Sequence, residues 1–336
     1  MENVGLLLNA VFSTVEMFKR EFYTKAGDLH MNIQDHHIPV LASELLALLQ
    51  LEPNHTVVDL TLGRSGHAQL VVKQLSPQAH FIGIDADPMQ IAYAQEQFKS
   101  SLVPVSLLQG NFASITELLH SINILKVDRI YADLGLSTVQ LLDPTRGFSF
   151  QSDTALDMRL DPNSSAPSAA TIIATMKEEE LADIFFQLGE EPESRYIAQA
   201  IVSQRKLKSI TTGIQLAEIV KAAKHRQNKK IHPATQVFQA LRMYVNDELG
   251  TLQKMLDQIP ALLTPQGRLA VITFHSLEDR LVKNTFKAWH QSGAMTLVNK
   301  KVVRPQWTEK RDNPRARSSY LRIIENTSAP IRHSQS

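Results

Sequence analysis

Residues 56–67 have the sequence TVVDLTLGRSGH, a short apolar run followed by a turn that contains two glycines. Short apolar runs bounded by turn residues are typical of buried strands, and glycine lets the backbone approach a ligand closely. We expect a helix to begin at Gly66 and to present its free backbone N–H groups to a carboxylate or phosphate. Taken alone, the turn fits a plain tight turn equally well.

Strands and helices alternate on both sides of this turn. Apolar residues at helical spacing predict a helix over 38–51, and the helix that begins at Gly66 should extend to 75. Further strands are expected over 80–85, 103–108 and 127–133, with a helix after Pro88, where proline suits the first helical position. The alternation predicts a doubly wound α/β sheet of parallel strands, with ligands at their carboxyl ends.

The alternation stops in the middle of the chain. Between about 144 and 248 we find loops and then helical periodicity only, over 178–188, 194–204, 213–223 and 235–249. The α/β pattern resumes with a helix over 252–263 and strands over 268–274 and 319–324. We therefore expect an N-terminal extension (1–30), an α/β domain made of 31–143 and 249–326, a helical insertion over 144–248 and a flexible tail over 327–336. Because Met31 directly precedes the first domain segment, residues 1–30 are expected to be a dispensable extension or a misassigned start.

Composition excludes several classes of protein and of site. The 336 residues are 43% hydrophobic and 21% charged, as in globular proteins, and 35 Lys plus Arg balance 34 Asp plus Glu. The absence of cysteine excludes disulfides, thiolate zinc sites and cysteine nucleophiles, and it fits the reducing cytoplasm, where we expect the protein. We identify no signal peptide, and no apolar stretch approaches the ~20 residues of a membrane span. The pair His36–His37 lacks partners at ligand spacing, so no metal site is predicted.

Candidate ligand-binding residues follow three of the predicted strands. Asp85 ends the second strand, about 20 residues beyond the first glycine turn, where a carboxylate can bind both ribose hydroxyls of an adenosine. The spacing Gly-x-x-Gly, without a third glycine, argues against a dinucleotide. Phe112 follows the third strand and could flank an adenine. The structural alternatives are a helix N-cap, which fits Asp87 better than Asp85, and a core position for Phe112.

Asp133 ends the fourth strand and is the candidate catalytic residue. If the reaction is methylation of an exocyclic amine, which is a poor nucleophile, it needs an acceptor that polarises an N–H bond and holds the nitrogen in line. Asp133 could supply that acceptor, or it could merely cap the strand end. His67 and His275 are as easily packing or capping residues as catalytic ones.

Six motifs together resemble one family, the bacterial small-subunit ribosomal RNA cytosine-N4 methyltransferases of the MraW type. The resemblance covers nearly the whole chain from His36 to about Ile324. The motifs, in order, are HIPVL (37–41), DLGLSTVQ (133–140), RGFSF (146–150), LDMR (156–159), FHSLEDR (274–280) and NPRARS (313–318). One departure stands at the first turn, where Gly-Gly-His is commoner in relatives and this chain has Ser65-Gly66-His67; it puts the backbone role of Ser65 in doubt.

The resemblance implies a Rossmann-like class I methyltransferase sheet interrupted by an all-helical insertion domain. It implies S-adenosyl-L-methionine as cofactor and N4 of a cytidine in the decoding centre of 16S ribosomal RNA as target. The cofactor contacts of the family fall here on Ser65, Gly66, His67, Asp85, Phe112, Asp133 and Gln140. The family's catalytic base is not carried over, so Asp133 remains a hypothesis as the group that orients the amine.

RNA would be held by local basic clusters, since the net charge is near zero. One cluster lies in the helical insertion; it comprises Arg205, Lys206, Lys208, Lys221, Lys224, His225, Arg226, Lys229 and Lys230. The second surrounds Trp307, which offers a stacking face; it comprises Lys300, Lys301, Arg304, Lys310, Arg311, Arg315, Arg317 and Arg322. The target base must be unstacked, so we expect the loop 143–161 to help form its pocket. The candidate substrate residues are Arg146, Phe148, Phe150, Arg159, His275, Arg315 and Arg317, although the two phenylalanines could equally be buried plugs and the basic clusters could be solvated surface.

Three alternatives stay open on the residues alone. A nicotinamide dehydrogenase shares the sheet but is opposed by the missing third glycine. An RNA-binding ribosome assembly factor without turnover would keep the fold, although Asp85 and Asp133 argue against lost activity. An amino-methyltransferase that acts on DNA, on protein or on another RNA is separated only by the resemblance. The sequence leaves the oligomeric state open, a homodimer included.

Overall fold

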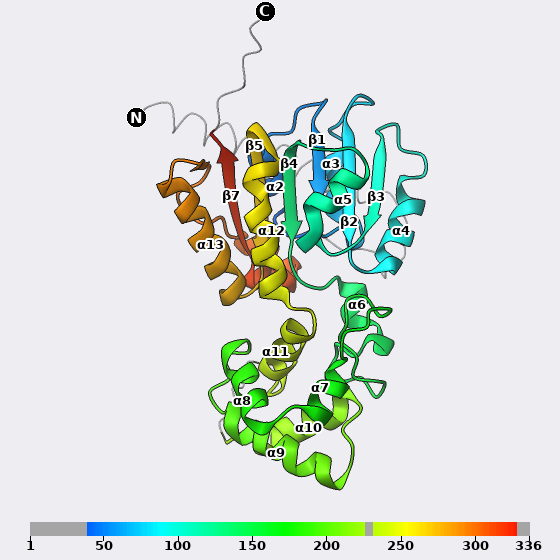
Figure 1. Ribbon diagram of the computed structural model, residues 1–336, viewed down its shortest axis with the longest axis vertical. Helices are drawn as coiled ribbons and strands as arrows, with labels where there is room; N and C mark the ends of the chain where they lie inside the picture. Colours follow the sequence, from blue (N-terminus) through cyan, green and yellow to red (C-terminus); the bar gives the residue numbers. More distant parts are fainter. Residues whose placement is uncertain (1–38, 226–230, 328–336) are drawn as a thin grey trace, which may run out of the picture. The chain divides into compact units, whose positions relative to one another are not determined.

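The computed structural model describes residues 39–225 and 231–327. The expected extension 1–30, the pair His36–His37 and all of the expected tail beyond Thr327 lie outside the described residues. The first described helix carries the label α2 in Figure 1.

The chain folds as two compact units. The first takes the chain up to Gly135 and again from Leu252 onward, and the second comprises Leu136–Thr251. The second unit therefore starts earlier and ends later than the insertion expected over 144–248. Helix α6 (Thr138–Leu142) belongs to it, although the sequence pattern had left this short segment with the sheet.

The first unit is built on a seven-stranded sheet of order β3-β2-β1-β4-β5-β7-β6. Strands β1 to β5 are parallel, and β7 pairs antiparallel with both β5 and β6. The strands are β1 (Thr56–Asp59), β2 (His80–Asp85), β3 (Val105–Gln109), β4 (Val127–Asp133), β5 (Leu263–Thr273), β6 (Met295–Leu297) and β7 (Tyr320–Asn326). The α/β prediction is thus confirmed, and the carboxyl ends of β1, β2, β3 and β4 lie at one edge.

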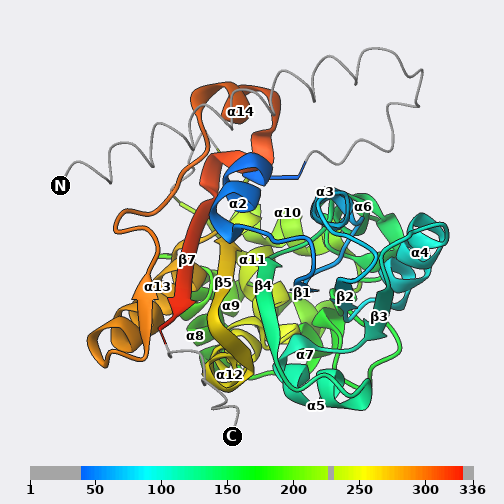
Figure 2. The same ribbon diagram turned by 90° about the horizontal axis from the view of Figure 1, so that it is seen from above.

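Helices cover both faces of the sheet, as Figure 2 shows for α5 and α12 on one side and α2 and α3 on the other. Side-chain alternation along each strand divides the apolar residues between the faces, so that Val58 packs with α5, α12 and α13, whereas Val57 packs with α2, α3 and α4. The helices are α2 (Ala42–Leu49), α3 (Gly66–Val72), α4 (Pro88–Phe98), η1 (Phe112–Ser114), α5 (Ile115–Ser121), α12 (Glu248–Leu262), α13 (Ser276–Gln291), α14 (Trp307–Asp312) and η3 (Pro314–Ser318).

The second unit contains only helices and loops among its described residues, apart from an isolated β-bridge between Ala155 and Thr212. Its apolar core includes Leu156, Phe185 and Leu241. The helices are α6, η2 (Pro144–Arg146), α7 (Ala169–Thr175), α8 (Glu178–Gln187), α9 (Ser194–Leu207), α10 (Gly213–Ala223) and α11 (Thr235–Val245). In the part of the chain that the structure describes, no helix is both long and apolar enough to traverse a membrane.

Candidate active site

The turn after β1 is held in left-handed backbone conformations. Gly63 has φ 47°, and Ser65, at the N-cap of α3, has φ 60°. Glycine adopts this region freely, but a serine there is strained. Ser65 is fully buried, and its Oγ has no hydrogen-bond partner within the described structure. This serine therefore carries a cost that glycine would avoid at the same position.

Asp85 ties the turn to the ends of β2 and β3. Its Oδ2 accepts the N–H of Gly63 over 2.8 Å and its Oδ1 accepts the N–H of Asp87 over 2.9 Å, while its backbone carbonyl accepts the N–H of Gly110. Asp87 is buried and caps α4 through Met89, as its sequence context predicted. Phe112 is half-buried against the core. The Asp85 carboxylate is thus oriented at the strand ends by two backbone N–H groups.

Asp133 is fixed at the end of β4 by neighbours in the turn after β1 and on α3. Its backbone N–H donates to Oγ1 of Thr61 over 2.6 Å, and its Oδ2 lies 3.5 Å from Nδ1 of His67. Its Oδ1 is buried and has no hydrogen-bond partner among the described residues. Burial raises the pKa of Asp133 to about 7, with Glu278 adding to the rise and Arg315 opposing it.

A second buried carboxyl group, that of Asp59, was not predicted as a site residue. Asp59 ends β1 at 1% exposure, beside Tyr131 on β4, and its Oδ1 accepts the N–H of Thr61. Burial raises its pKa to about 7. The signal in the sequence is a carboxylate between the apolar residues Val58 and Leu60, because a buried carboxylate needs a partner or a function.

Of the candidate substrate residues in this unit, only Arg315 acts on the Asp133 pair. Its charge lowers the pKa of both Asp133 and His67, and its guanidinium carbon lies 5.9 Å from the centre of the Phe274 ring. His275 instead caps α13, because its Nδ1 accepts the N–H of Glu278. Arg317 is exposed, and its Nε donates to the carbonyl of Lys310.

The other candidate residues belong to the helical unit, where most are committed to its internal structure. Gln140 closes a capping box with Ser137 at the start of α6. Arg146 is buried and donates to the carbonyls of Arg159 and Leu160, so its guanidinium takes part in the internal hydrogen bonding of this loop. Arg159 itself pairs with Asp157 through Nε and Nη2.

The phenylalanines of the RGFSF motif also differ from the expected stacking surface. Phe148 is buried in the helical core, and Phe150 is half-buried with its ring stacked on His232 at 4.2 Å. The alternative of buried plugs therefore describes Phe148. Gly147, directly before Phe148, has φ 70°, and a Cβ there would lie 2.5 Å from the carbonyl oxygen of Ala155, so this loop requires glycine.

Comparison with known proteins identifies the family. The model of the MraW methylase family matches residues 34–327. The chain belongs to this family. This methylase is 44% identical over 295 residues to "Ribosomal RNA small subunit methyltransferase H" of Deinococcus radiodurans, an alignment that covers 88% of the chain and 91% of the relative. Proteins of the same name from Coprothermobacter proteolyticus and Thermomicrobium roseum are each 42% identical, with 86% of the chain and 95% and 93% of the relatives covered.

Membership confirms the family predicted from the six motifs, together with methyl transfer from S-adenosyl-L-methionine. The described strand ends fit that cofactor, because the oriented Asp85 carboxylate suits a ribose and the half-exposed Phe112 suits a purine. The polar atoms of Asp133 and Ser65 that lack partners are the kind of groups a bound ligand can satisfy.

The predicted basic cluster of the methylase's helical unit divides into engaged and exposed side chains. Lys224 lies 2.6 Å from Glu191 in a nearly dry ion pair, and Arg205 donates to the carbonyl of Ile173. These two are structural. Lys206, Lys208, Lys221 and His225 are exposed, and Arg226, Lys229 and Lys230 lie outside the described residues.

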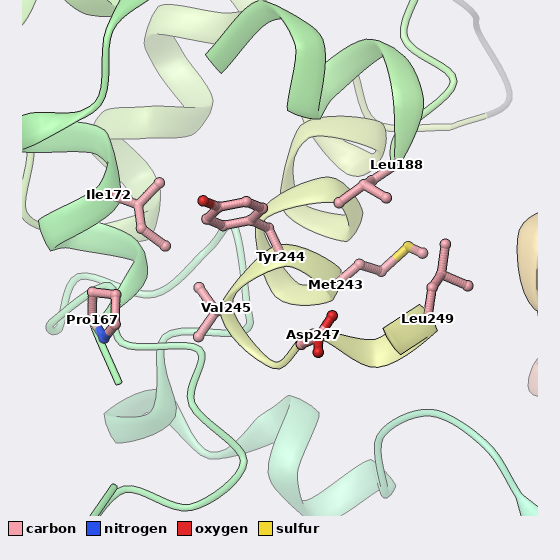
Figure 3. Close-up of a pocket in the computed structure, with 8 residues that line it drawn as sticks. All are labelled: Pro167, Ile172, Leu188, Met243, Tyr244, Val245, Asp247 and Leu249. Atoms are coloured by element: carbon pink, nitrogen blue, oxygen red, sulfur yellow. The ribbon is translucent and has the colours of Figure 1, made fainter. Parts of the chain in front are cut away.

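A pocket of about 330 Å³ in the helical unit was not predicted from the sequence. Figure 3 shows the Tyr244 ring between Ile172 and Met243, with the Asp247 carboxylate lower in the view, near Leu249. The remaining lining residues are Pro167, Leu188, Val245 and Leu249. Six of the eight lining side chains are apolar, and Tyr244 and Asp247 contribute one hydroxyl and one carboxylate.

Proposed function

We propose that this methylase transfers a methyl group from S-adenosyl-L-methionine to N4 of a cytidine in the decoding centre of 16S ribosomal RNA. The observation that carries the proposal is the buried, oriented carboxyl group of Asp133 at a strand end of a chain in the MraW methylase family. The names of the relatives, which specify small-subunit ribosomal RNA, support the substrate class.

The chemistry that remains for the protein is to position the amine and remove its proton. When bound, the cofactor supplies an electrophilic methyl group on a sulfonium, so the protein's share is binding, orientation and exclusion of water. The cofactor would be held by Ser65, Gly66, His67, Asp85, Phe112 and Asp133, with Gln140 as a further contact. The Asp133 carboxylate would accept a hydrogen bond from the exocyclic N–H and hold the nitrogen in line with the methyl group.

RNA would be bound by the exposed basic side chains and by Arg315, whose charge lies within reach of Asp133. The first unit would form the catalytic domain, and the second unit, 136–251, the RNA-binding domain. A ribosomal RNA substrate would place the enzyme in the cytoplasm.

The test is to incubate the protein with labelled S-adenosyl-L-methionine and small ribosomal subunits from cells that lack this enzyme. The expected result is label at one cytidine, located by mass spectrometry of the RNA fragments. Asp133→Asn should lower the single-turnover rate by about 100-fold or more, a size typical of a lost positioning and proton-accepting group. The control Asp128→Asn changes the amino end of the same strand, where Asp128 accepts from Thr56 and Thr264, and should leave the rate unchanged.

Two outcomes would overturn the proposal. Label on DNA, on protein or on another RNA would favour an amino-methyltransferase of different substrate class. Tight binding to small subunits without any turnover would favour an assembly factor.

A further inference from the structure

His67 and Asp133 form a buried pair beneath the strand ends. The side chain of His67 is 7% exposed and that of Asp133 is 13% exposed, with 3.5 Å between Nδ1 and Oδ2. Two titratable groups in contact away from water influence each other strongly, because neither is screened by solvent.

The carbonyl of Val40 fixes the tautomer of His67. It lies 2.9 Å from Nε2, and because a carbonyl oxygen can only accept, Nε2 must carry a proton. Burial lowers the pKa of His67, so the ring is neutral near pH 7. Nδ1 of the neutral ring is then a bare lone pair that faces the Asp133 carboxyl group.

The distance between Nδ1 of His67 and Oδ2 of Asp133 indicates that no proton, and so no hydrogen bond, lies between the two atoms. A formed hydrogen bond would bring the two atoms to about 2.7–3.2 Å. A lone pair opposite an ionised carboxylate gains nothing from close approach, and 3.5 Å is the separation observed. One added proton would convert this contact into an attractive one.

The surroundings favour uptake of one proton at this pair. Asp59 on β1, Tyr131 on β4 and Glu278 on α13 face the pair, while Arg315 on η3 is the one described cation that opposes protonation of Asp133. Burial makes a negative charge on Asp133 costly and raises its pKa to about 7, and the Glu278 carboxylate adds to the rise.

We propose that the His67–Asp133 pair accepts the proton that the target amine loses, with Asp133 as the acceptor and His67 as the positioning residue that shares the proton. This inference rests on the proposed function. As the bond between nitrogen and the methyl carbon forms, the bond between that carbon and sulfur breaks and its electron pair remains on sulfur. The N–H proton passes to the Asp133 carboxylate, whose new O–H donates to Nδ1 of His67. The proton leaves to solvent after product release.

A purely structural histidine would account for less of the geometry. Anchoring α3 to Val40 requires only Nε2 and leaves the position of Nδ1 opposite Asp133 without a role. The neutral tautomer selected by Val40 is the one that leaves an empty acceptor facing the carboxyl group.

The test uses His67→Gln in the full chain. The amide nitrogen of glutamine can replace Nε2 and keep the bond to Val40, while nothing replaces Nδ1. At saturating cofactor and small subunits we expect a rate loss of about 10- to 100-fold. The midpoint of the pH–rate profile should also move to lower pH, because the protonated form of Asp133 loses its acceptor. The control His80→Gln removes a half-buried histidine at the amino end of β2, which contacts Ser106, and should leave rate and midpoint unchanged.

Binding of S-adenosylhomocysteine and thermal melting separate this role from a structural one. Weaker binding with an unchanged midpoint would overturn the inference, as would a rate within threefold of the parent protein. If His67→Gln does not fold, the imidazole nitrogen shifts of the unsubstituted protein decide: a proton on Nδ1 of neutral His67 overturns the inference. Absence of methyl transfer by the unsubstituted chain would instead contradict the proposed function.

Discussion

The backbone N–H of Gly63 donates a hydrogen bond of 2.8 Å to Oδ2 of Asp85, which joins the first glycine turn to the end of β2. One carboxylate therefore both shapes the turn and faces the expected ribose. Asp85→Asn keeps the size of the side chain but removes one acceptor, and each lost hydrogen bond to a charged group costs about 1.5–3 kcal/mol. We expect about 10- to 100-fold weaker binding of S-adenosylhomocysteine by isothermal titration calorimetry.

The matched control for Asp85 is Asp87→Asn. Asparagine caps helices about as well as aspartate, so the cap on Met89 is kept and affinity should change less than threefold. Equal losses in the two variants would show that the loop, and not the Asp85 carboxylate, sets cofactor affinity.

The buried carboxyl groups of Asp59 and Asp133 should make folding stability fall as pH rises. Both have pKa values of about 7 in the folded protein, above the ordinary value of 3.8. Between pH 3.8 and about 7 the folded state binds more protons than the unfolded state. The stability that the two groups contribute is therefore complete below pH 3.8 and is lost as the pH rises to about 7. Activity should change in the opposite direction, since amine positioning needs ionised Asp133.

Urea unfolding of the cofactor-free protein at pH 5, 6, 7 and 8 measures this effect. The parent should lose stability relative to Asp133→Asn as the pH rises, by on the order of 1 kcal/mol in unfolding free energy per pH unit up to pH 7. A difference that does not change with pH would mean that Asp133 stays ionised in the folded state.

The strands were predictable because each is a buried apolar run between turn residues. The expected strands over 80–85 and 127–133 match β2 and β4 in full. Strand β5 begins earlier than expected, at Leu263, because Leu263 pairs with Val127 before the register shifts at Arg129. The local sequence around Pro265 indicates a turn, and no local pattern reveals that long-range pairing.

Side-chain partners were harder to predict than strands. Arginine is a common phosphate-binding residue, but Arg146 is buried and donates hydrogen bonds to two carbonyls of its own loop. His275 has the setting of a catalytic histidine and caps α13. In both cases the deciding contact is with a backbone group, whose position depends on tertiary folding that residue type does not encode.

Ser65 should be a site where substitution stabilises the protein. A non-glycine residue in the left-handed region costs about 1–3 kcal/mol, and a buried hydroxyl without a partner adds to that cost. Ser65→Gly should therefore raise the free energy of unfolding by about 1 kcal/mol after the entropy of glycine in the unfolded chain is subtracted. Ser65→Ala, which removes the hydroxyl and keeps the strain, should recover less; a larger gain for alanine would contradict the role of backbone strain.

Removing one partner of the Lys224–Glu191 ion pair should destabilise the helical unit much more than replacing both partners. Glu191 is fully buried and Lys224 is 9% exposed in its side chain. Glu191→Gln leaves a buried ammonium group without its counter-charge, which should cost about 3–5 kcal/mol in chemical denaturation. Replacing both residues by methionine should restore most of the loss, whereas a double variant as unstable as Glu191→Gln would show that other contacts of this pair matter more.

Trp307 should contribute to RNA binding without contributing to stability. Its side chain is 71% exposed, and the guanidinium carbon of Arg311 lies 5.4 Å from its ring centre, within a segment that also exposes Arg304 and Arg317. An exposed ring among cations offers a face for a base next to phosphate contacts, and stacking contributes about 1–3 kcal/mol per base. Trp307→Ala should weaken binding of small-subunit RNA about fivefold or more in filter-binding assays, and Trp307→Phe should retain most of the affinity. Leu102→Ala, at a site 85% exposed in the same unit, is the control for loss of an exposed apolar side chain.

Stacking also differs from phosphate contact in its response to salt, so Trp307→Ala should keep the salt dependence of the parent while its affinity falls at every salt concentration. A reduced salt dependence would indicate that Trp307 acts by positioning Arg311, and unchanged affinity would remove it from the RNA surface.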